Sequence, residues 1–395
     1  MKIGRTIYFD HQATTPPDWR VLAAMEPYFR ERFGNPHSAD HVFGWRAAEA
    51  VEGAALRIAT MLGADADEIV FTSGATEANN LAMLGLARAA AGGDRNRVLV
   101  GAAEHKSVLA LARVLRDQLG YEVETIPVGA DGVADVGALE AMIDERVLFV
   151  SVMLVNNEIG SVNPVREIGR VCESRGVLLH CDGAQAPVAA DLGAVSDSAD
   201  LLSLSAHKMY GPMGAGVLFV RRSVRGRIHP VMHGGGQQGH LRSGTLPVPL
   251  CVGTGAAAEI ISGAGMENER ARLRRLRDRF VSGLRALDWP IHLNGPDLAA
   301  RHPGNANMRF EGFSAHDILG LLQPGLAAST GSACTTGSPE SSHVLAAIGL
   351  TRAEADASIR FSLGRQTSSE DVEEAVVLIG RALADLSGSG LSAAV

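Results

Sequence analysis

Leu201-Leu202-Ser203-Leu204 is an apolar run that predicts a buried strand, and it leads directly into Ser205-Ala206-His207-Lys208-Met209-Tyr210-Gly211-Pro212. Only three of the chain's 36 Lys and Arg residues are lysines, so a lysine at the end of a buried strand stands out. Lysine differs from arginine because it can lose its proton and form an imine. We therefore predict that Lys208 is a Schiff-base lysine, whereas Lys2 and Lys106 are surface charges in a lysine-poor chain.

The composition is that of a folded protein with a full core. The chain has 395 residues, of which 46% are hydrophobic and 20% charged, which is enough for two domains. Its net charge of -8 argues against nucleic acids and anionic membranes as primary partners. No apolar run is long enough to span a bilayer, and no signal-type segment precedes the strand-like Ile7-Tyr8-Phe9, so we expect a cytoplasmic protein.

Short apolar runs alternate with helical patterns through most of the chain. This alternation is typical of an α/β fold with a mixed, mainly parallel sheet and crossover helices. Strands are predicted at 68–71, 97–100, 147–153, 177–180, 201–204 and 216–220. A smaller α+β domain is predicted from strand-like segments at 306–310, 327–329 and 358–361 and a last helix at 369–386. We assign residues 17–262 to the large domain, and residues 1–16 with 263–395 to the small one.

The four cysteines are widely separated and form no C-x-x-C pair, which excludes a zinc ribbon and gives no disulfide framework. His180-Cys181-Asp182 is rich in ligand types, but neighbours along a strand point to opposite faces, so we predict no metal site. Cys172 and Cys251 have apolar neighbours and are expected to be structural. Cys334 lies instead in the small, polar, Gly-containing stretch 329–338, which predicts a mobile loop and makes this cysteine the candidate nucleophile.

Two further stretches place polar groups directly after predicted strands. Thr72-Ser73-Gly74-Ala75-Thr76-Glu77 follows a predicted strand and opens a helix, whose N-terminal N–H groups suit a phosphate. Taken alone, this stretch is better explained as an ordinary helix cap. Asp182 follows the predicted strand at 177–180 and lies 26 residues before Lys208 in the sequence. A carboxylate there either caps a turn or, beside an imine lysine, pairs with the protonated ring nitrogen of pyridoxal 5'-phosphate.

These residues belong to motifs that extend over nearly the whole chain. The chain resembles pyridoxal-phosphate enzymes of fold type I, the aspartate-aminotransferase type, and within the class-V aminotransferases it is similar to cysteine desulfurases of the NifS and IscS kind. The resemblance runs from Phe9-Asp10-His11-Gln12-Ala13-Thr14-Thr15-Pro16 to Ile359-Arg360-Phe361-Ser362-Leu363-Gly364-Arg365. The specific matches between these ends are Phe71-Thr72-Ser73-Gly74-Ala75-Thr76-Glu77, Val155-Asn156-Asn157-Glu158-Ile159-Gly160, Arg242-Ser243-Gly244-Thr245 and Ser332-Ala333-Cys334-Thr335.

The resemblance implies a role for individual residues around the cofactor ring. Lys208 would form the Schiff base, and Asp182 would hold the pyridine nitrogen. His105, in Glu104-His105-Lys106-Ser107, would stack on the ring and move protons. Asn157 and Gln185 would approach the oxygen substituent of the ring.

The resemblance also implies how the phosphate and the substrate are held. The phosphate would be bound by Ala75, Thr76, Ser205 and His207. Thr245 would reach the phosphate from a second subunit, which implies a homodimer. Asn35 and Arg360 would bind the substrate, and arginine is physically suited to a bidentate clamp on an amino-acid carboxylate.

The implied reaction converts L-cysteine into L-alanine. Lys208 would remove the Cα proton, and the Cys334 thiolate would attack the substrate sulfur and keep it as a persulfide. A sulfur-acceptor protein, an iron-sulfur scaffold or a thiolation enzyme, would then take the sulfur. No Lys or Arg flanks Cys334, so its activation has to come through space, from His105 or from the substrate. A selenocysteine lyase, an aminotransferase and a kynureninase-like hydrolase are the alternatives, although an aminotransferase needs no loop cysteine.

Two readings from other classes can be weighed on the sequence. Residues 233–239 contain a formal G-x-G-x-x-G, but this dinucleotide-binding pattern needs a strand before it and an apolar helix after it, and neither is predicted. A cofactor-free scaffold in sulfur assembly is the second alternative. Such a scaffold would be colourless, whereas a pyridoxal-phosphate enzyme is yellow and is bleached by borohydride.

Overall fold

The computed structural model describes residues 2–331 and 341–388. Its main feature is a seven-stranded sheet of order β3-β9-β8-β7-β6-β4-β5. The strands are β3 (Ile69–Thr72), β4 (Arg97–Gly101), β5 (Glu122–Ile126), β6 (Val147–Ser151), β7 (Leu178–Asp182), β8 (Leu201–Ser205) and β9 (Gly216–Val220). β9 is antiparallel to both of its neighbours, and the other pairs are parallel, which confirms the mixed, mainly parallel sheet.

Helices cover both faces of this sheet, which explains the continuous apolar runs of its strands. Every residue of β4, β6, β7, β8 and β9 is buried. Along β8, Leu201 packs into one hydrophobic cluster, and Leu202 and Leu204 pack into another on the opposite face. The helices of this part are α3 (Val42–Leu62), α4 (Ala75–Ala89), α5 (Lys106–Leu119), α6 (Val136–Met142), α7 (Val165–Ser174), α8 (Ala186–Ala189), α9 (Gly193–Ser196) and α10 (Val248–Ser262).

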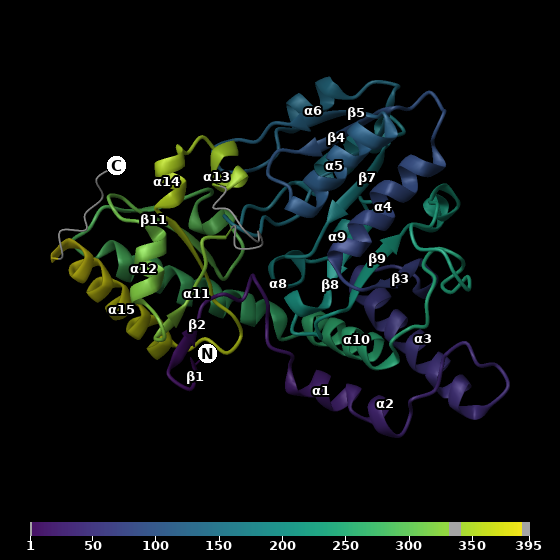
Figure 1. The fold of residues 1–395 in the computed structure, drawn as a ribbon, viewed down its shortest axis with the longest axis horizontal. Coiled ribbons are helices and arrows are strands. Elements are labelled where there is room, and N and C mark those ends of the chain that lie inside the picture. Colours follow the sequence, from purple (N-terminus) through teal and green to yellow (C-terminus); the bar gives the residue numbers. More distant parts are fainter. Residues whose placement is uncertain (1, 332–340, 389–395) are drawn as a thin grey trace.

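Two small sheets lie apart from the large one, beside the termini (Figure 1). The first contains β10 (Ile291–Leu293), β11 (Asn305–Phe310) and β13 (Ser358–Ser362), and the second contains β1 (Lys2–Ile3), β2 (Thr6–Tyr8) and β12 (Leu326–Ala327). Their helices are α11 (Met266–Arg285), α12 (Ala315–Leu321), α13 (His343–Ala347), α14 (Arg352–Asp356) and α15 (Ser369–Gly388). Phe280 of α11 packs edge-on against Phe9 and Phe361, so the N-terminal segment shares a core with the C-terminal elements. The domain boundaries stay a prediction.

Two short helices, α1 (Trp19–Met25) and α2 (Pro27–Arg30), connect the N-terminal strands to α3. Short 3-10 turns complete the described chain at Ala66–Glu68, Ala206–Lys208, Arg222–Arg227 and Leu298–Ala300. Residues 228–247, all of which the structure describes, contain neither a helix nor a strand. The G-x-G-x-x-G of this segment therefore lacks the strand-turn-helix setting that dinucleotide binding needs.

Among the described residues, no single helix has both the length and the apolar character needed to cross a membrane. One bent pair, α10 with α11, meets these criteria only when its two helices are counted together, and they meet at 77°.

The parallel strands place their carboxyl ends at one edge of the sheet. β7 ends at Asp182, and β8 ends at Ser205, where the turn Ala206–Lys208 begins. β3 is antiparallel to β9 and leads into α4 at this edge. The functional side chains predicted from the sequence therefore belong to segments that meet at one place.

Candidate active site

A cavity of about 540 Å³ lies at this edge of the large sheet. It is lined by residues of the N-terminal segment, of the turn before α4, of the ends of β7 and β8, and of β13. Ten of the thirteen residues predicted from the sequence line it: Ala75, Thr76, His105, Asn157, Asp182, Gln185, Ser205, His207, Lys208 and Arg360. The structure brings these residues together, and their individual roles stay predictions.

Lys208 enters the cavity from the turn that follows β8. Its Nζ donates hydrogen bonds to the backbone carbonyls of Gln12 and Ala13, the latter at 2.8 Å. The amide of Gln185 also donates to the Gln12 carbonyl, at 2.7 Å. The N-terminal segment thus holds the lysine amine at the wall of the cavity, where an aldehyde could reach it.

Asp182 is almost fully buried, with 3% of its surface exposed, and both of its carboxylate oxygens accept hydrogen bonds. Oδ2 accepts from the Asn79 amide and Oδ1 from the Ala184 backbone N–H, each at 2.9 Å. Hydrogen bonds to both oxygens fix the orientation of the carboxylate. An anion so placed can pair with a protonated pyridine nitrogen.

His105 is the N-cap of α5 and lines the same cavity. Its Nδ1 accepts a hydrogen bond from the Ser107 backbone N–H at 3.1 Å and lies 2.8 Å from the Ser107 hydroxyl. Burial lowers the pKa of His105 below its ordinary value, so the ring is neutral at neutral pH. A neutral, fixed ring can stack on a planar cofactor.

The first turn of α4 offers a cradle for an anion. Gly74, which precedes this helix, has a φ of 152°, which L side chains rarely adopt. A Cβ on Gly216 of β9 would lie 2.5 Å from the Gly74 Cα, so Gly216 is needed for this close approach, and Gly74 is needed for its φ. The backbone N–H groups of the helix start and the Ser205 hydroxyl then face the cavity, an arrangement that suits a phosphate.

The acidic residue in this first turn is neutralised by an ion pair. Glu77 would repel a phosphate, but its Oε1 accepts from the Arg242 Nε at 2.7 Å, and its Oε2 accepts from the Ser73 backbone N–H. Arg242 lies three residues before Thr245 in the matched motif. The pair therefore ties the segment that carries Thr245 to the start of α4.

Arg360, on β13, is buried and lines the same cavity. Its Nη2 donates to Asp10 Oδ1 at 2.6 Å and to the Ser329 hydroxyl at 2.8 Å, and its Nη1 donates to the Asn157 carbonyl at 2.8 Å. Its Nε is buried and has no partner among the described residues. The hydrogen bonds to Asp10, Ser329 and Asn157 use both hydrogens of Nη2 and one of Nη1, so the second Nη1 hydrogen is a donor available to a carboxylate in the cavity.

The other predicted residues are not among those that line this cavity. Asn35 is exposed, and its side-chain oxygen accepts from the His37 backbone N–H; Thr245 is also exposed. Cys334 lies outside the described residues, so its prediction as nucleophile is untested by the structure. Burial raises the pKa of Cys172 and of Cys251 to about 12, and raises that of Cys181 as well, so these three thiols are poor nucleophiles.

Several contributing residues had no role assigned from the sequence: Asp10, Gln12, Asn79 and Ser107. Asn79 could have been found by helical spacing, because it lies three residues after Thr76 and so on the same face of α4. Asp10 and Gln12 lie in a matched motif, but their partners come from segments about 200 or more residues away in sequence, and no local pattern reveals those contacts.

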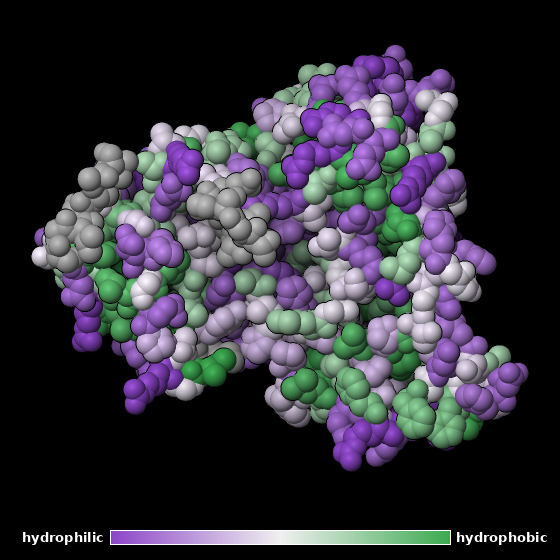
Figure 2. All heavy atoms as spheres, in the orientation of Figure 1, coloured by the Kyte–Doolittle hydropathy of each residue, from purple (hydrophilic) through white to green (hydrophobic). Residues whose placement is uncertain are grey.

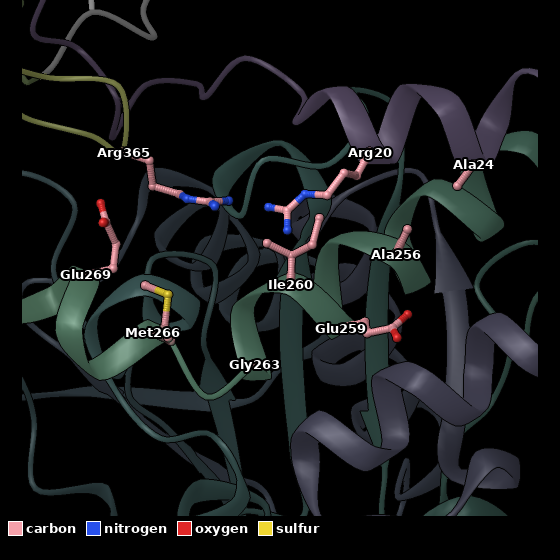
Figure 3. Close-up of a pocket in the computed structure, with 10 residues that line it drawn as sticks. Arg20, Ala24, Ala256, Glu259, Ile260, Gly263, Met266, Glu269 and Arg365 are labelled. Carbon is pink, nitrogen blue, oxygen red and sulfur yellow. The ribbon is translucent and has the colours of Figure 1, made fainter.

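A second cavity of about 560 Å³ lies between α1, α10 and α11 (Figure 3). Arg20 and Arg365 point toward each other across it, and Glu259 and Glu269 lie at its sides (Figure 3). None of the residues predicted from the sequence lines this cavity.

Comparison with known proteins places the chain in a family. Residues 7–375 match the family described as Aminotransferase class-V. The cysteine desulfurase IscS of Rickettsia felis is 46% identical over 373 residues, which cover 94% of this chain and 90% of that protein. A solved NifS-like protein aligns with a TM-score of 0.89 and 34% identity over 96% of this chain and all of its own. A solved structure of SspA in complex with cysteine aligns with a TM-score of 0.79 and 34% identity, over 92% of this chain and all of its own.

The chain therefore belongs to the class-V aminotransferases, a family of enzymes that depend on pyridoxal phosphate. Within this family it belongs to the cysteine desulfurases of the IscS and NifS type, as its motifs predicted. The fold of the chain is accordingly that of pyridoxal-phosphate enzymes of fold type I.

The residues of the cavity fit pyridoxal phosphate. A buried carboxylate with both oxygens hydrogen-bonded, a helix start with open N–H groups and a lysine amine line one space, and these match the three polar parts of the cofactor: ring nitrogen, phosphate and aldehyde. The ring nitrogen would be held by Asp182, the phosphate by the first turn of α4, and the aldehyde by Lys208.

Proposed function

We propose that this chain is a pyridoxal-phosphate-dependent enzyme that removes sulfur from L-cysteine, releases L-alanine and holds the sulfur as a persulfide on Cys334. The observation that carries the proposal is the convergence of Lys208, Asp182 and Arg360 on one cavity of about 540 Å³. An amine, an anion and a carboxylate clamp around one space are what an amino-acid substrate on this cofactor requires.

Each residue then has a defined task. Arg360 binds the substrate carboxylate and so orients the amino acid, and the Lys208 amine takes the Cα proton. Pyridoxal phosphate, when bound, withdraws electrons from the Cα and thereby weakens the neighbouring C–S bond. The Cys334 thiolate attacks the substrate sulfur, so that an S–S bond forms as the C–S bond breaks. The three described cysteines are buried thiols of raised pKa, which supports Cys334 in this role.

The test compares Cys334→Ala with Cys251→Ala. Cys334→Ala should bind the cofactor and L-cysteine but release no sulfide, whereas Cys251→Ala, which removes a buried thiol, should keep turnover if it folds. Undiminished sulfide release by the Cys334 variant would remove this residue from the mechanism. Borohydride reduction followed by peptide mass spectrometry should place the cofactor adduct on Lys208, and an adduct at another residue would contradict the whole assignment.

A homodimer is part of the proposal. Large apolar side chains are exposed along α1, α2 and the start of α3: Trp19, Leu22, Phe29, Phe33, Phe43 and Trp45. Apolar residues gather over this end of the molecule in the space-filling view (Figure 2). Surface patches of this kind mark protein interfaces. The exposed Asn35 and Thr245 would then act at the cavity of the partner subunit rather than at their own.

Sedimentation measurements test the dimer. The protein should sediment as a dimer, and Phe33→Glu together with Trp45→Glu should shift it toward monomer. A wild-type protein that stays monomeric at high concentration would exclude the assigned role of Thr245.

The proposed setting is the cytoplasm, and the sulfur acceptor would be an iron-sulfur scaffold or a thiolation enzyme. Trapping a mixed disulfide on Cys334 would identify that acceptor.

A further inference from the structure

A chain of hydrogen bonds connects Asp182 to His105 through two residues without an assigned role. Asn79 is fully buried on α4, and its Nδ2 donates to Asp182 Oδ2 at 2.9 Å and to the Ser107 hydroxyl at 3.1 Å. The Ser107 hydroxyl in turn lies 2.8 Å from His105 Nδ1. Four side chains from β7, α4 and the start of α5 are thus linked in one line.

The direction of the first bonds follows from their chemistry. An ionised carboxylate only accepts hydrogen bonds, so the Asn79 atom that faces Asp182 has to be the amide nitrogen. This nitrogen carries two hydrogens, one for Asp182 and one for Ser107. The Ser107 oxygen is therefore an acceptor toward Asn79, and its own hydrogen remains for His105.

The protonation of His105 follows from these directions. The backbone N–H of Ser107 can only donate, and it donates to His105 Nδ1 at 3.1 Å. With the Ser107 hydroxyl as a second donor, Nδ1 meets two hydrogens and has to present its lone pair. In a neutral imidazole the other nitrogen then carries the proton. The tautomer is therefore set by two donors together, the backbone N–H and the hydroxyl of Ser107.

Burial and the neighbouring charges together decide whether the His105 ring is protonated. Asp182 and Glu158 favour the protonated ring, whereas Lys208 and His343 oppose it. Burial is the largest influence and also opposes the charge, so the pKa of His105 is lowered. The start of α5 adds the positive end of a helix dipole beside the ring.

We infer that Asn79 and Ser107 are positioning residues that hold His105 as the neutral Nε2–H tautomer, so that His105 acts in the cavity as a hydrogen-bond donor and not as a base. This inference rests on the proposed function, in which Lys208 takes the Cα proton. It narrows the role implied by the family resemblance, in which His105 moves protons. The acceptor of the Nε2–H is an oxygen or sulfur of the cofactor or the substrate.

The direct test is nitrogen NMR of the holoenzyme with ring-labelled histidine, in which the His105 signals are assigned by their loss in His105→Gln. The wild type should show protonated Nε2 and unprotonated Nδ1 at pH 7 to 8. Protonated Nδ1, or a charged ring, would overturn the inference. This readout is independent of turnover, so it stands or falls separately from the desulfurase activity.

Kinetic variants give a second test. His105→Gln keeps an N–H donor near the Nε2 position but cannot act as a base, whereas His105→Leu has neither function. The Gln variant should retain at least tenfold more kcat than the Leu variant, and equal losses would contradict a donor role. Ser107→Ala should lower kcat several-fold with little change in KM, and Ser107→Thr should restore it. The two Ser107 variants decide the question, because failure of the Thr variant to restore kcat would count against the inference.

Discussion

The two cavities of this protein are nearly equal in volume, about 540 Å³ and 560 Å³, but their polar groups are bonded in different ways. In the cavity at the sheet edge, the Lys208 amine is held by backbone carbonyls of the N-terminal segment, and His105 is held by the backbone N–H of Ser107 in its own segment. Arg360, which also lines this cavity, pairs with Asp10. In the cavity of Figure 3, the charged side chains pair with one another: Arg20 and Arg365 with Asp18, Glu259 with Arg57, and Glu269 with Arg272.

This difference in hydrogen-bonding partners distinguishes the candidate active site from the cavity between α1, α10 and α11. Side chains held by backbone donors and acceptors keep an ionisable group directed at the cavity, because their own partners do not change charge. Ion pairing leaves little for a ligand where it uses all the donors of a side chain, whereas Arg360 pairs with Asp10 and still keeps a donor. Cavity volume alone therefore does not identify the candidate active site in this protein. The hydrogen-bonding partners of the lining side chains are more informative.

The largest effect is expected at Lys208. Lys208→Arg keeps the positive charge but cannot form an imine, so turnover should fall by at least about a thousandfold. The yellow colour of the holoenzyme should also be altered. Lys2→Arg, which changes another of the three lysines, is the matched control and should leave the rate unchanged. If the Lys208→Arg enzyme kept more than a tenth of the wild-type rate of sulfide production, the assignment of the cavity at the sheet edge as the active site would be wrong.

Arg360 and Arg365 compare the cavities directly, because they are five residues apart and each lines one of them. Arg360→Gln should raise the KM for L-cysteine roughly 10- to 100-fold, as expected for the loss of a charged hydrogen bond to the carboxylate. Arg365→Gln should stay within about twofold, since its partner Asp18 lies outside the site. Steady-state kinetics on both variants measures the contrast, and equal effects on KM would refute it.

Asp18 should act on stability rather than on turnover. The hydrogen bond from Arg20, together with the charges of Arg20 and Arg365, lowers the pKa of Asp18 to about 2. A lowered carboxylate pKa contributes stability above the unfolded value near 4, and this contribution is lost as the pH falls toward 2. Asp18→Asn keeps the cap of α1 but should cost about 1–2 kcal/mol of unfolding free energy at pH 7, with kcat/KM nearly unchanged.

Urea unfolding of Asp18→Asn and wild type at pH 7 and at the lowest pH where both remain folded provides the measurement. The difference between the two proteins should shrink as the pH falls below 4. A difference that stays constant with pH would show that the charge of Asp18 is not the cause.

The smallest effect is expected at Arg20, whose side chain is 46% exposed. Arg20→Gln removes a partly exposed ion pair, so the change in unfolding free energy should be below about 1 kcal/mol and the kinetics should match the wild type. Thermal melts and sulfide assays would check both. A large rise in KM would instead make the second cavity a substrate site.

Six strands of the large sheet could be located from the sequence because they are buried on both faces and read as continuous apolar runs. β5 was missed because it is an edge strand with a largely half-exposed pattern, and β10 because it has only three residues. β7 extends to Asp182, two residues beyond the prediction, because Asp182 pairs with Ser203 of β8.

The candidate site could be predicted where chemistry is local in sequence. Lys208 stands out because lysine is rare and a buried strand precedes it. The hydrogen-bonding of Asn79, Ser107 and Asp10 could not be predicted, because each partner is chosen by how helices and strands approach one another after folding. The sequence therefore predicted many of the residues that line the cavity but not the hydrogen bonds that orient them.

The N-terminal segment has a consequence for how the enzyme matures. The carbonyls of Gln12 and Ala13 receive the Lys208 amine, and Asp10 pairs with Arg360, which lies 350 positions later. During synthesis, the N-terminal segment emerges from the ribosome long before β13, which carries Arg360, is made. Cofactor loading into a complete site is therefore a post-translational event, and nascent chains that end before β13 leave Asp10 without its arginine.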